Sequence, residues 1–310
     1  MKPYYVNANG TIIPVIPSQD LILESLPAGI YASKYSPFSG GWNLILQVFK
    51  TDGLVDLPDS VSDLIIREAD DFFKEETRQA FQRYGLLYKR GFLMYGQPGT
   101  GKSCLVAKIM NLMVAKHGIV LWNPEPERLL SLVGTIRTIE PARQIMIVWE
   151  ELDSILRGSE EILLSILDGE LNIDNVVYVA TTNYIDQIPD RIKNRPSRFA
   201  TVVEIPAPDY QSRLQYLEAK LSLESGLDLS QWAKLTEGFT IDHLKDLIVS
   251  VLCLKLPLEI AVSRIRALPG AVLKVKKSRT SKLTDLMNER VSLGDLAWDL
   301  ALPEDDDDSR

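Results

Sequence analysis

The octapeptide GQPGTGKS, Gly96 to Ser103, decides the fold of this 310-residue chain. It fits the pattern G-x-x-x-x-G-K-[ST], in which the glycines let backbone N–H groups converge on phosphate oxygens without obstruction by side chains. The apolar run FLMY precedes it, and a helical stretch from Lys102 to His117 follows it and is closed by Gly118. This order of strand, loop and helix predicts a phosphate-binding loop at a helix N-terminus, where the helix dipole favours anions.

The residues of this loop have separate expected roles. The Lys102 ammonium is expected to reach the β- and γ-phosphates of a nucleotide, and the Ser103 hydroxyl to ligate magnesium. The expected nucleotide-binding residues are Gly96, Gln97, Pro98, Gly99, Thr100, Gly101, Lys102, Ser103 and Cys104. The motif therefore predicts a nucleoside triphosphate with Mg²⁺.

Carboxylates follow the buried-strand candidate Ile145–Trp149 in the stretch IMIVWEELD. Because ligands bind at the carboxyl ends of parallel strands, Glu150 and Glu151 are expected beside the phosphate loop. Glu150 is the expected second magnesium ligand, and Glu151 the expected base that polarises the attacking water. The usual order is Asp then Glu, so Glu150 brings one extra methylene to the aspartate position.

Two further polar signals lie downstream. The apolar run VVYVA leads to Asn183, whose amide is expected to orient a water molecule, although a plain turn would explain it in isolation. Arg195 and Arg198 stand three residues apart before the run TVVEI. They are either surface arginines at a helix end or, if subunits form a ring, cations that reach a neighbour's γ-phosphate.

Short apolar runs alternate with helical stretches along the middle of the chain, at 92–95, 119–122, 145–149, 176–180 and 201–205. This alternation predicts an α/β fold with a parallel sheet covered on both faces. One continuous helical pattern is expected over 60–84, and residues 208–268 are helical throughout. The expected division is an N-terminal region with some β structure (1–57), an α/β ATPase subdomain (58–207), a helical lid (208–268) and a C-terminal extension (269–310).

Charge is unevenly distributed along the chain. The formal net charge is −8, but residues 304–310 alone contribute −4, and residues 264–282 hold seven bases and no acid. The basic stretch is interpreted either as a solvated linker or subunit contact, or as a patch for nucleic acid or another anionic surface. The tail is interpreted as a solubilising segment, or else as a shield for the basic stretch of its own or a neighbouring chain. A short helix is expected over 283–291. Two cysteines and two histidines exclude a disulfide framework and a zinc site, and with no signal peptide or membrane span we expect a cytoplasmic protein.

Taken together, GQPGTGKS, IMIVWEELD, VVYVATTN and NRPSRF, followed by a helical region, resemble an AAA ATPase module over about residues 57–268. The resemblance implies a P-loop NTPase fold with a five-stranded sheet in the order 5-1-4-3-2 and a C-terminal helical lid. It also implies a ring of six or seven subunits that hydrolyses ATP at subunit interfaces. In such a ring Asn183 is the sensor, and Arg195 and Arg198 act on the neighbouring site.

The segment before the loop, together with Glu150, is similar to the branch of the mitochondrial Rieske-protein translocase, but without that branch's membrane anchor. Leu132-Val133-Gly134 is the nearest match to an aromatic–hydrophobic–Gly pore loop, and helix packing is the favoured interpretation of Leu132. The expected function is remodelling, unfolding or translocation of a protein partner, which the sequence does not identify. A nucleic-acid-linked ATPase, similar to a helicase loader or clamp loader, and a structural ring assembled by ATP are the alternatives.

Overall fold

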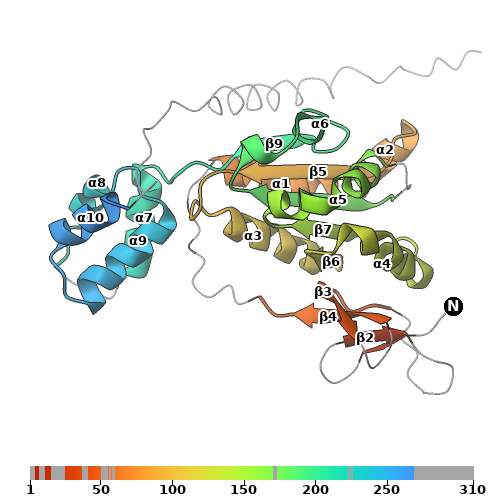
Figure 1. The fold of residues 1–310 in the computed structure, drawn as a ribbon, viewed down its shortest axis with the longest axis horizontal. Helices are drawn as coiled ribbons and strands as arrows, with labels where there is room; N and C mark the ends of the chain where they lie inside the picture. Colours follow the sequence, from red (N-terminus) through yellow and green to blue (C-terminus); the bar gives the residue numbers. More distant parts are fainter. Residues whose placement is uncertain are drawn as a thin grey trace, which may run out of the picture. The chain divides into compact units, whose positions relative to one another are not determined.

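The computed structural model describes most of the chain up to Leu268 (Figure 1). The described residues are 4–6, 11–14, 25–36, 41–49, 55, 57, 60–169, 173–222, 224 and 226–268. The expected helix over 283–291, the acidic tail and the part of the basic stretch beyond Leu268 lie outside these ranges. None of the described helices is long and apolar enough to cross a membrane.

Five parallel strands, called the central strands below because they carry the phosphate loop, run from the β9 edge of the sheet in the order β9-β5-β8-β7-β6. Their bounds are β5 Lys89–Tyr95, β6 Ile119–Trp122, β7 Ile145–Trp149, β8 Val176–Thr182 and β9 Thr201–Glu204. Numbered along the chain, this part of the sheet has the expected order 5-1-4-3-2. Every residue of β7 and β8 is buried, as expected for apolar strands covered on both faces.

The sheet as a whole differs from the expected five strands, because the N-terminal region extends it to nine in the order β1-β2-β4-β3-β6-β7-β8-β5-β9. The additional strands are β1 Tyr4–Val6, β2 Thr11–Pro14, β3 Gly29–Ser36 and β4 Gly41–Gln47. β3 pairs in parallel with β6, and β4, β2 and β1 follow as antiparallel neighbours. The expected count and full order were therefore wrong, since the N-terminal strands continue the sheet beyond β6.

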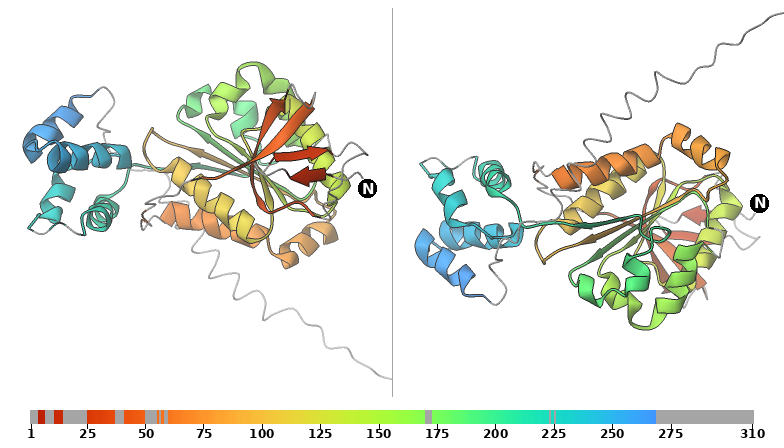
Figure 2. Two further views of the ribbon diagram at one scale, coloured as in Figure 1. Left: turned by 90° about the horizontal axis from the view of Figure 1, so that it is seen from below. Right: turned by 90° about the horizontal axis from the view of Figure 1, so that it is seen from above.

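Helices cover both faces of the central strands (Figure 2). Successive residues of a strand point to opposite faces, so Met146 and Val148 pack with helices α1 Ser60–Phe72 and α3 Lys102–Ala115. Their neighbour Ile147 packs with the helices of the other face. These helices are α4 Pro126–Ile139 and α5 Leu152–Asp168. The two apolar layers fix the sheet between the helices and leave its strand ends to carry polar groups.

The helix expected over 60–84 is interrupted. α1 ends at Phe72, and α2 runs over Glu75–Arg83 after Lys74, whose backbone is extended. The Thr77 hydroxyl donates to the Asp71 carbonyl at 2.7 Å and Lys74 Nζ pairs with the Asp71 carboxylate at 2.6 Å. At the break, the Asp71 carbonyl oxygen thus accepts a side-chain hydrogen bond in place of the backbone N–H that a continuous helix would supply.

Helices after β9 have an apolar core of their own. They are α7 Tyr210–Lys220, α8 Leu229–Leu235, α9 Ile241–Ile248 and α10 Leu258–Arg266, with a π-helical turn over Val249–Cys253. Trp232, Phe239 and Leu244 are buried in this core. Short elements between β8 and β9 are the 3₁₀ turn Ile185–Gln187 and helix α6 Asp190–Lys193.

Candidate nucleotide site

The loop between β5 and α3 has a backbone that requires glycine. Gly96, Gly99 and Gly101 have φ angles of 153°, 77° and 106°. A Cβ atom on Gly96 would lie 2.3 Å from the Ile205 carbonyl oxygen, and one on Gly99 would lie 2.8 Å from Asp242 Oδ2. The loop therefore passes close to its neighbours while leading directly into the N-terminus of α3, which is the geometry of an anion-binding cradle.

Lys102 lies at the centre of this cradle. Its side chain is 8% exposed, and Nζ donates hydrogen bonds to the carbonyl oxygens of Gly96 at 2.8 Å and Gln97 at 2.7 Å. Burial lowers the pKa of Lys102 to about 8, while the nearby Asp242 carboxylate acts in the opposite direction. An ammonium with little solvent around it binds a phosphate oxygen strongly, because less water is displaced.

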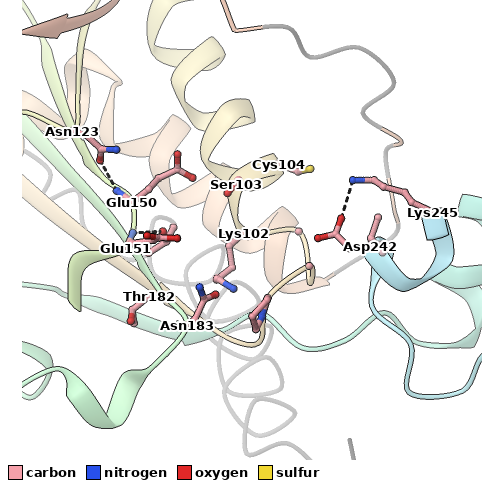
Figure 3. Close-up of a pocket in the computed structure, with 15 residues that line it drawn as sticks. Lys102, Ser103, Cys104, Asn123, Glu150, Glu151, Thr182, Asn183, Asp242 and Lys245 are labelled. Carbon is pink, nitrogen blue, oxygen red and sulfur yellow. Dashed lines mark hydrogen bonds and ion pairs between the residues drawn. The ribbon is translucent and has the colours of Figure 1, made fainter. Parts of the chain in front are cut away.

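Two acidic residues leave the end of β7 in a fixed arrangement (Figure 3). The Glu150 backbone N–H donates to Asn123 Oδ1 at 2.8 Å, and the Trp122 indole N–H donates to Glu150 Oε2 at 3.2 Å. The Glu151 backbone N–H donates to the Thr181 hydroxyl at 3.3 Å. Glu151 also has a left-handed backbone with φ 54° and ψ 54°, a conformation that costs a non-glycine residue about 1 kcal/mol or more and clusters at functional sites.

The end of β8 completes this wall. The Thr182 hydroxyl donates to Asp153 Oδ1 at 2.6 Å, and both side chains are buried. This hydrogen bond ties the first turn of α5 to β8. Asn183 follows directly and lines the same cavity as Lys102 (Figure 3). The expected role of its amide in orienting a water molecule stays a prediction.

These elements surround a cavity of about 470 Å³, which is within the size range of small-molecule sites. Of the residues expected from the sequence, the cavity brings together Pro98, Gly99, Gly101, Lys102, Ser103, Cys104, Glu150, Glu151 and Asn183. Gly96, Gln97 and Thr100 shape the loop from outside this lining: Thr100 Oγ1 donates to the Gln97 carbonyl at 3.0 Å. The donor set of one ammonium, one hydroxyl and two carboxylates fits a nucleotide with Mg²⁺, which usually binds through one or two carboxylates and the phosphates.

Six lining residues were not expected from the sequence: Asn123, Thr181, Thr182, Ile241, Asp242 and Lys245. Asn123 follows β6, and Thr181 and Thr182 are the last residues of β8, so their place at a strand end was the available signal. The others come from α9, whose Ile241 N–H donates to the Gly99 carbonyl at 3.0 Å. No local pattern connects α9 with a loop 140 residues earlier, so only the fold reveals this wall. Asp242 and Lys245 form an ion pair at 3.0 Å there.

The two arginines differ from each other, and neither lines the cavity of its own chain. The Arg198 side chain is 5% exposed and grips Asp168 in a bidentate pair, Nε to Oδ1 at 2.6 Å and Nη2 to Oδ2 at 2.5 Å. The Arg195 side chain is 60% exposed, with Nη1 4.0 Å from Asp168 Oδ2. The role of both residues in a neighbouring site stays a prediction, for which Arg195 has the accessible guanidinium.

The candidate pore loop is part of a helix. Leu132 and Val133 are buried within α4 and pack in the core on that face of the sheet. Helix packing, the favoured interpretation of Leu132, is confirmed. His243 in the first turn of α9 accepts a hydrogen bond from the Thr240 backbone N–H at Nδ1 over 3.1 Å and thereby caps the helix.

The fold and the cavity define a phosphate-loop nucleotide-binding domain, with a parallel sheet whose strand ends carry the site. Residues 92–207 match the model of the "ATPase family associated with various cellular activities (AAA)". The match begins within β5 and extends just past β9, so it covers the phosphate loop, both acidic residues, Asn183 and both arginines.

Individual relatives share this segment. The chain is 33% identical to a cell division cycle protein 48 homolog of Archaeoglobus fulgidus over 184 residues, which are 52% of this chain and 24% of the relative. It is 27% identical to the vesicular-fusion protein sec18 of Schizosaccharomyces pombe, over 69% of this chain and 31% of the relative. It is 32% identical to a proteasome-activating nucleotidase of Methanoculleus marisnigri, over 52% and 44% respectively. The chain thus spans less than half the length of each of these relatives.

Proposed function

We propose that this chain is an AAA ATPase that hydrolyses ATP at the subunit interfaces of a ring and uses the energy to remodel, unfold or translocate a protein partner. The observation that carries the proposal is the convergence of Lys102, Glu150, Glu151 and Asn183 on one cavity beside a glycine loop. The family match covers the same residues. One relative is named as a vesicular-fusion protein and another as a proteasome-activating nucleotidase.

Each side chain has a task in this reaction. The loop N–H groups and Lys102 bind the phosphates, and Ser103 and Glu150 hold Mg²⁺. Bound magnesium would supply charge neutralisation at the phosphate oxygens. Glu151 accepts a hydrogen bond from the attacking water, and Asn183 orients that water. Glu151 lines the cavity and has a left-handed backbone.

The surroundings of the two arginines support the proposed ring. Asp168 at the end of α5 pairs with Arg198 and lies near Arg195, and the charge of Lys89 also lowers the pKa of Asp168. Three cations share one carboxylate there, so the group carries surplus positive charge that suits a phosphate supplied by a second subunit. In this proposal Arg195 reaches the neighbour's γ-phosphate, and Arg198 positions the segment through Asp168. A closed ring of six or seven copies would give every site such a neighbour.

Two substitutions test hydrolysis directly. Lys102→Ala should abolish nucleotide binding, and Glu151→Gln should retain binding and lose turnover by a factor of about 10² or more. Lys234→Ala and Glu75→Gln, on exposed helix surfaces, are matched controls for the loss of charge. Steady-state ATP turnover unchanged by both Lys102→Ala and Glu151→Gln would refute the proposal.

The finer assignments stay proposals. Similarity to the Rieske-translocase branch depends on the segment before the loop and on Glu150, and the relatives found have other names. The cytoplasmic location stays a prediction as well. The nucleic-acid alternative depends on the basic stretch, most of which lies outside the described residues. Steady-state ATP turnover would exclude a ring that uses ATP only for assembly.

A further inference from the structure

Glu150 is held by its neighbours on β6. Its carboxylate lies one methylene further from the backbone than that of the aspartate that such sites usually carry. A glutamate also has one more rotatable bond, so more conformational entropy is lost when its carboxylate is held in one orientation. The Trp122 indole N–H donates to Glu150 Oε2 at 3.2 Å, and the Glu150 backbone N–H donates to Asn123 Oδ1 at 2.8 Å. Two consecutive residues at the end of one strand therefore hold both the carboxylate and the backbone of Glu150.

The tryptophan that donates this hydrogen bond is itself fixed. Its ring meets Phe49 edge to face, with centroids 5.0 Å apart and planes at 84°. Its backbone pairs with Val148 in the parallel ladder of β6 and β7, and the next residue, Asn123, donates its N–H to the Val148 carbonyl at 2.8 Å. Asn123 has a left-handed backbone, with φ 45°, which ends the strand at this point. The indole N–H is thus presented from a rigid position beside the cavity.

We infer that Trp122 is the positioning residue that lets Glu150 serve in the place of an aspartate. The inference rests on the proposed function, in which Glu150 holds Mg²⁺. With Oε2 bound to the indole, the carboxylate keeps one orientation and its other oxygen, Oε1, stays available on the cavity side. A hydrogen bond of ordinary net strength changes an equilibrium constant about fivefold, here the one between the carboxylate orientation that binds Mg²⁺ and the others.

The pairing of a longer acid with an indole donor makes the two residues interdependent. An aspartate at position 150 has a shorter side chain, so its carboxylate would withdraw from an indole that now lies at 3.2 Å. Replacing Trp122 should then no longer change the affinity for Mg²⁺. This dependence separates positioning of Glu150 from a general packing role for Trp122, because packing against Phe49 does not involve the acid.

Calorimetry measures the affinity of the full chain for ADP, once in the presence of Mg²⁺ and once in the presence of a chelator. The ratio of the affinity with Mg²⁺ to the affinity with the chelator is the magnesium-dependent gain. The variants are Trp122→Phe, Glu150→Gln, Glu150→Asp and the double variant Trp122→Phe with Glu150→Asp. We expect Trp122→Phe to lower the gain about fivefold, with affinity in the chelator unchanged, and to have no further effect in the Glu150→Asp background. Trp122→benzothienylalanine, in which sulfur replaces the indole N–H and the ring shape is nearly unchanged, should reproduce the loss and keep the ring contacts.

The outcomes distinguish the two proposals. If Glu150→Gln keeps the full gain, Glu150 does not hold Mg²⁺, and the metal assignment and this inference both fail. If Glu150→Gln loses the gain and Trp122→Phe keeps it, the metal assignment stands and the positioning role is overturned. An equal loss of ADP affinity with and without Mg²⁺, or an equal effect of Trp122→Phe in both backgrounds, also overturns it, since either result indicates packing alone.

Discussion

Nucleotide binding to this chain should take up a proton at Lys102. Burial lowers the pKa of this ammonium to about 8, so about half of the free protein carries a neutral lysine at pH 8, and about a tenth at pH 7. A polyphosphate beside Nζ favours the charged form and raises the pKa again. Binding of ADP should therefore take up about 0.5 proton at pH 8 and about 0.1 at pH 7.

Calorimetry in two buffers of different ionisation enthalpy measures this uptake, because the apparent binding enthalpy then varies with the number of protons exchanged. The last proton of the terminal phosphate leaves near pH 6, so the ligand contributes little at pH 8. Lys102→Arg is the matched control, since a guanidinium stays charged throughout this range and should show no uptake. Affinity of the natural chain should also fall as the pH rises above 8. Equal uptake in both proteins, or none in either, would refute the assignment of Lys102 as a partly neutral phosphate ligand.

Three further outcomes follow from the packing. Arg198→Ala removes the bidentate partner of Asp168 and should lower the free energy of unfolding in urea by about 2–3 kcal/mol. Because the hydrogen bond from Arg198 is the largest cause that lowers the pKa of Asp168, the folded protein binds this proton less readily than the unfolded chain, so the contribution is present above the pKa of the unfolded carboxyl and is lost as the pH falls. This pH dependence should be smaller in the variant, in which Arg195 and Lys89 still act on Asp168. Tyr178→Phe should be neutral or stabilising by about 1 kcal/mol, since the buried Tyr178 hydroxyl has no hydrogen-bond partner among the described residues, and a clear loss in thermal melting would contradict this. Gly96→Ala places a Cβ 2.3 Å from the Ile205 carbonyl oxygen at a φ of 153°, so it should abolish ADP binding in calorimetry, and unchanged affinity would show that the loop can move.

The phosphate loop and the central strands could be predicted because their signals are local. Positive φ angles strongly favour glycine, so the three glycines of the motif at Gly96–Ser103 indicate the conformation of the loop. The run Ile145–Trp149 is apolar at every position, as a strand covered on both faces requires, and the strand has the same bounds in the structure. Polar residues directly after such strands must lie at one edge of the sheet, which is why Glu150, Glu151 and Asn183 could be assigned to one site.

The parts that could not be predicted depend on contacts between distant residues. β3 pairs with β6 through three residue pairs, Gly29–Ile119 to Tyr31–Leu121. Nothing in the sequence of β3 specifies a parallel partner strand ninety residues further along the chain. The cavity wall from Asp242 and Lys245 requires the Ile241–Gly99 hydrogen bond, and the different environments of Arg195 and Arg198 depend on Asp168. The sequence spacing of Arg195 and Arg198 does not indicate that one is exposed and the other buried.

The central claim is that each ATP site is completed by an arginine from a neighbouring subunit. Its most direct test is steady-state ATP turnover in mixtures of two inactive variants, Arg195→Ala and Glu151→Gln, in rings shown to contain both. An Arg195→Ala subunit keeps an intact cavity, and a Glu151→Gln neighbour supplies the missing guanidinium. At equal mixing about a quarter of the interfaces are complete, so we expect recovery of up to about a quarter of the natural activity. No recovery at any mixing ratio would contradict the claim.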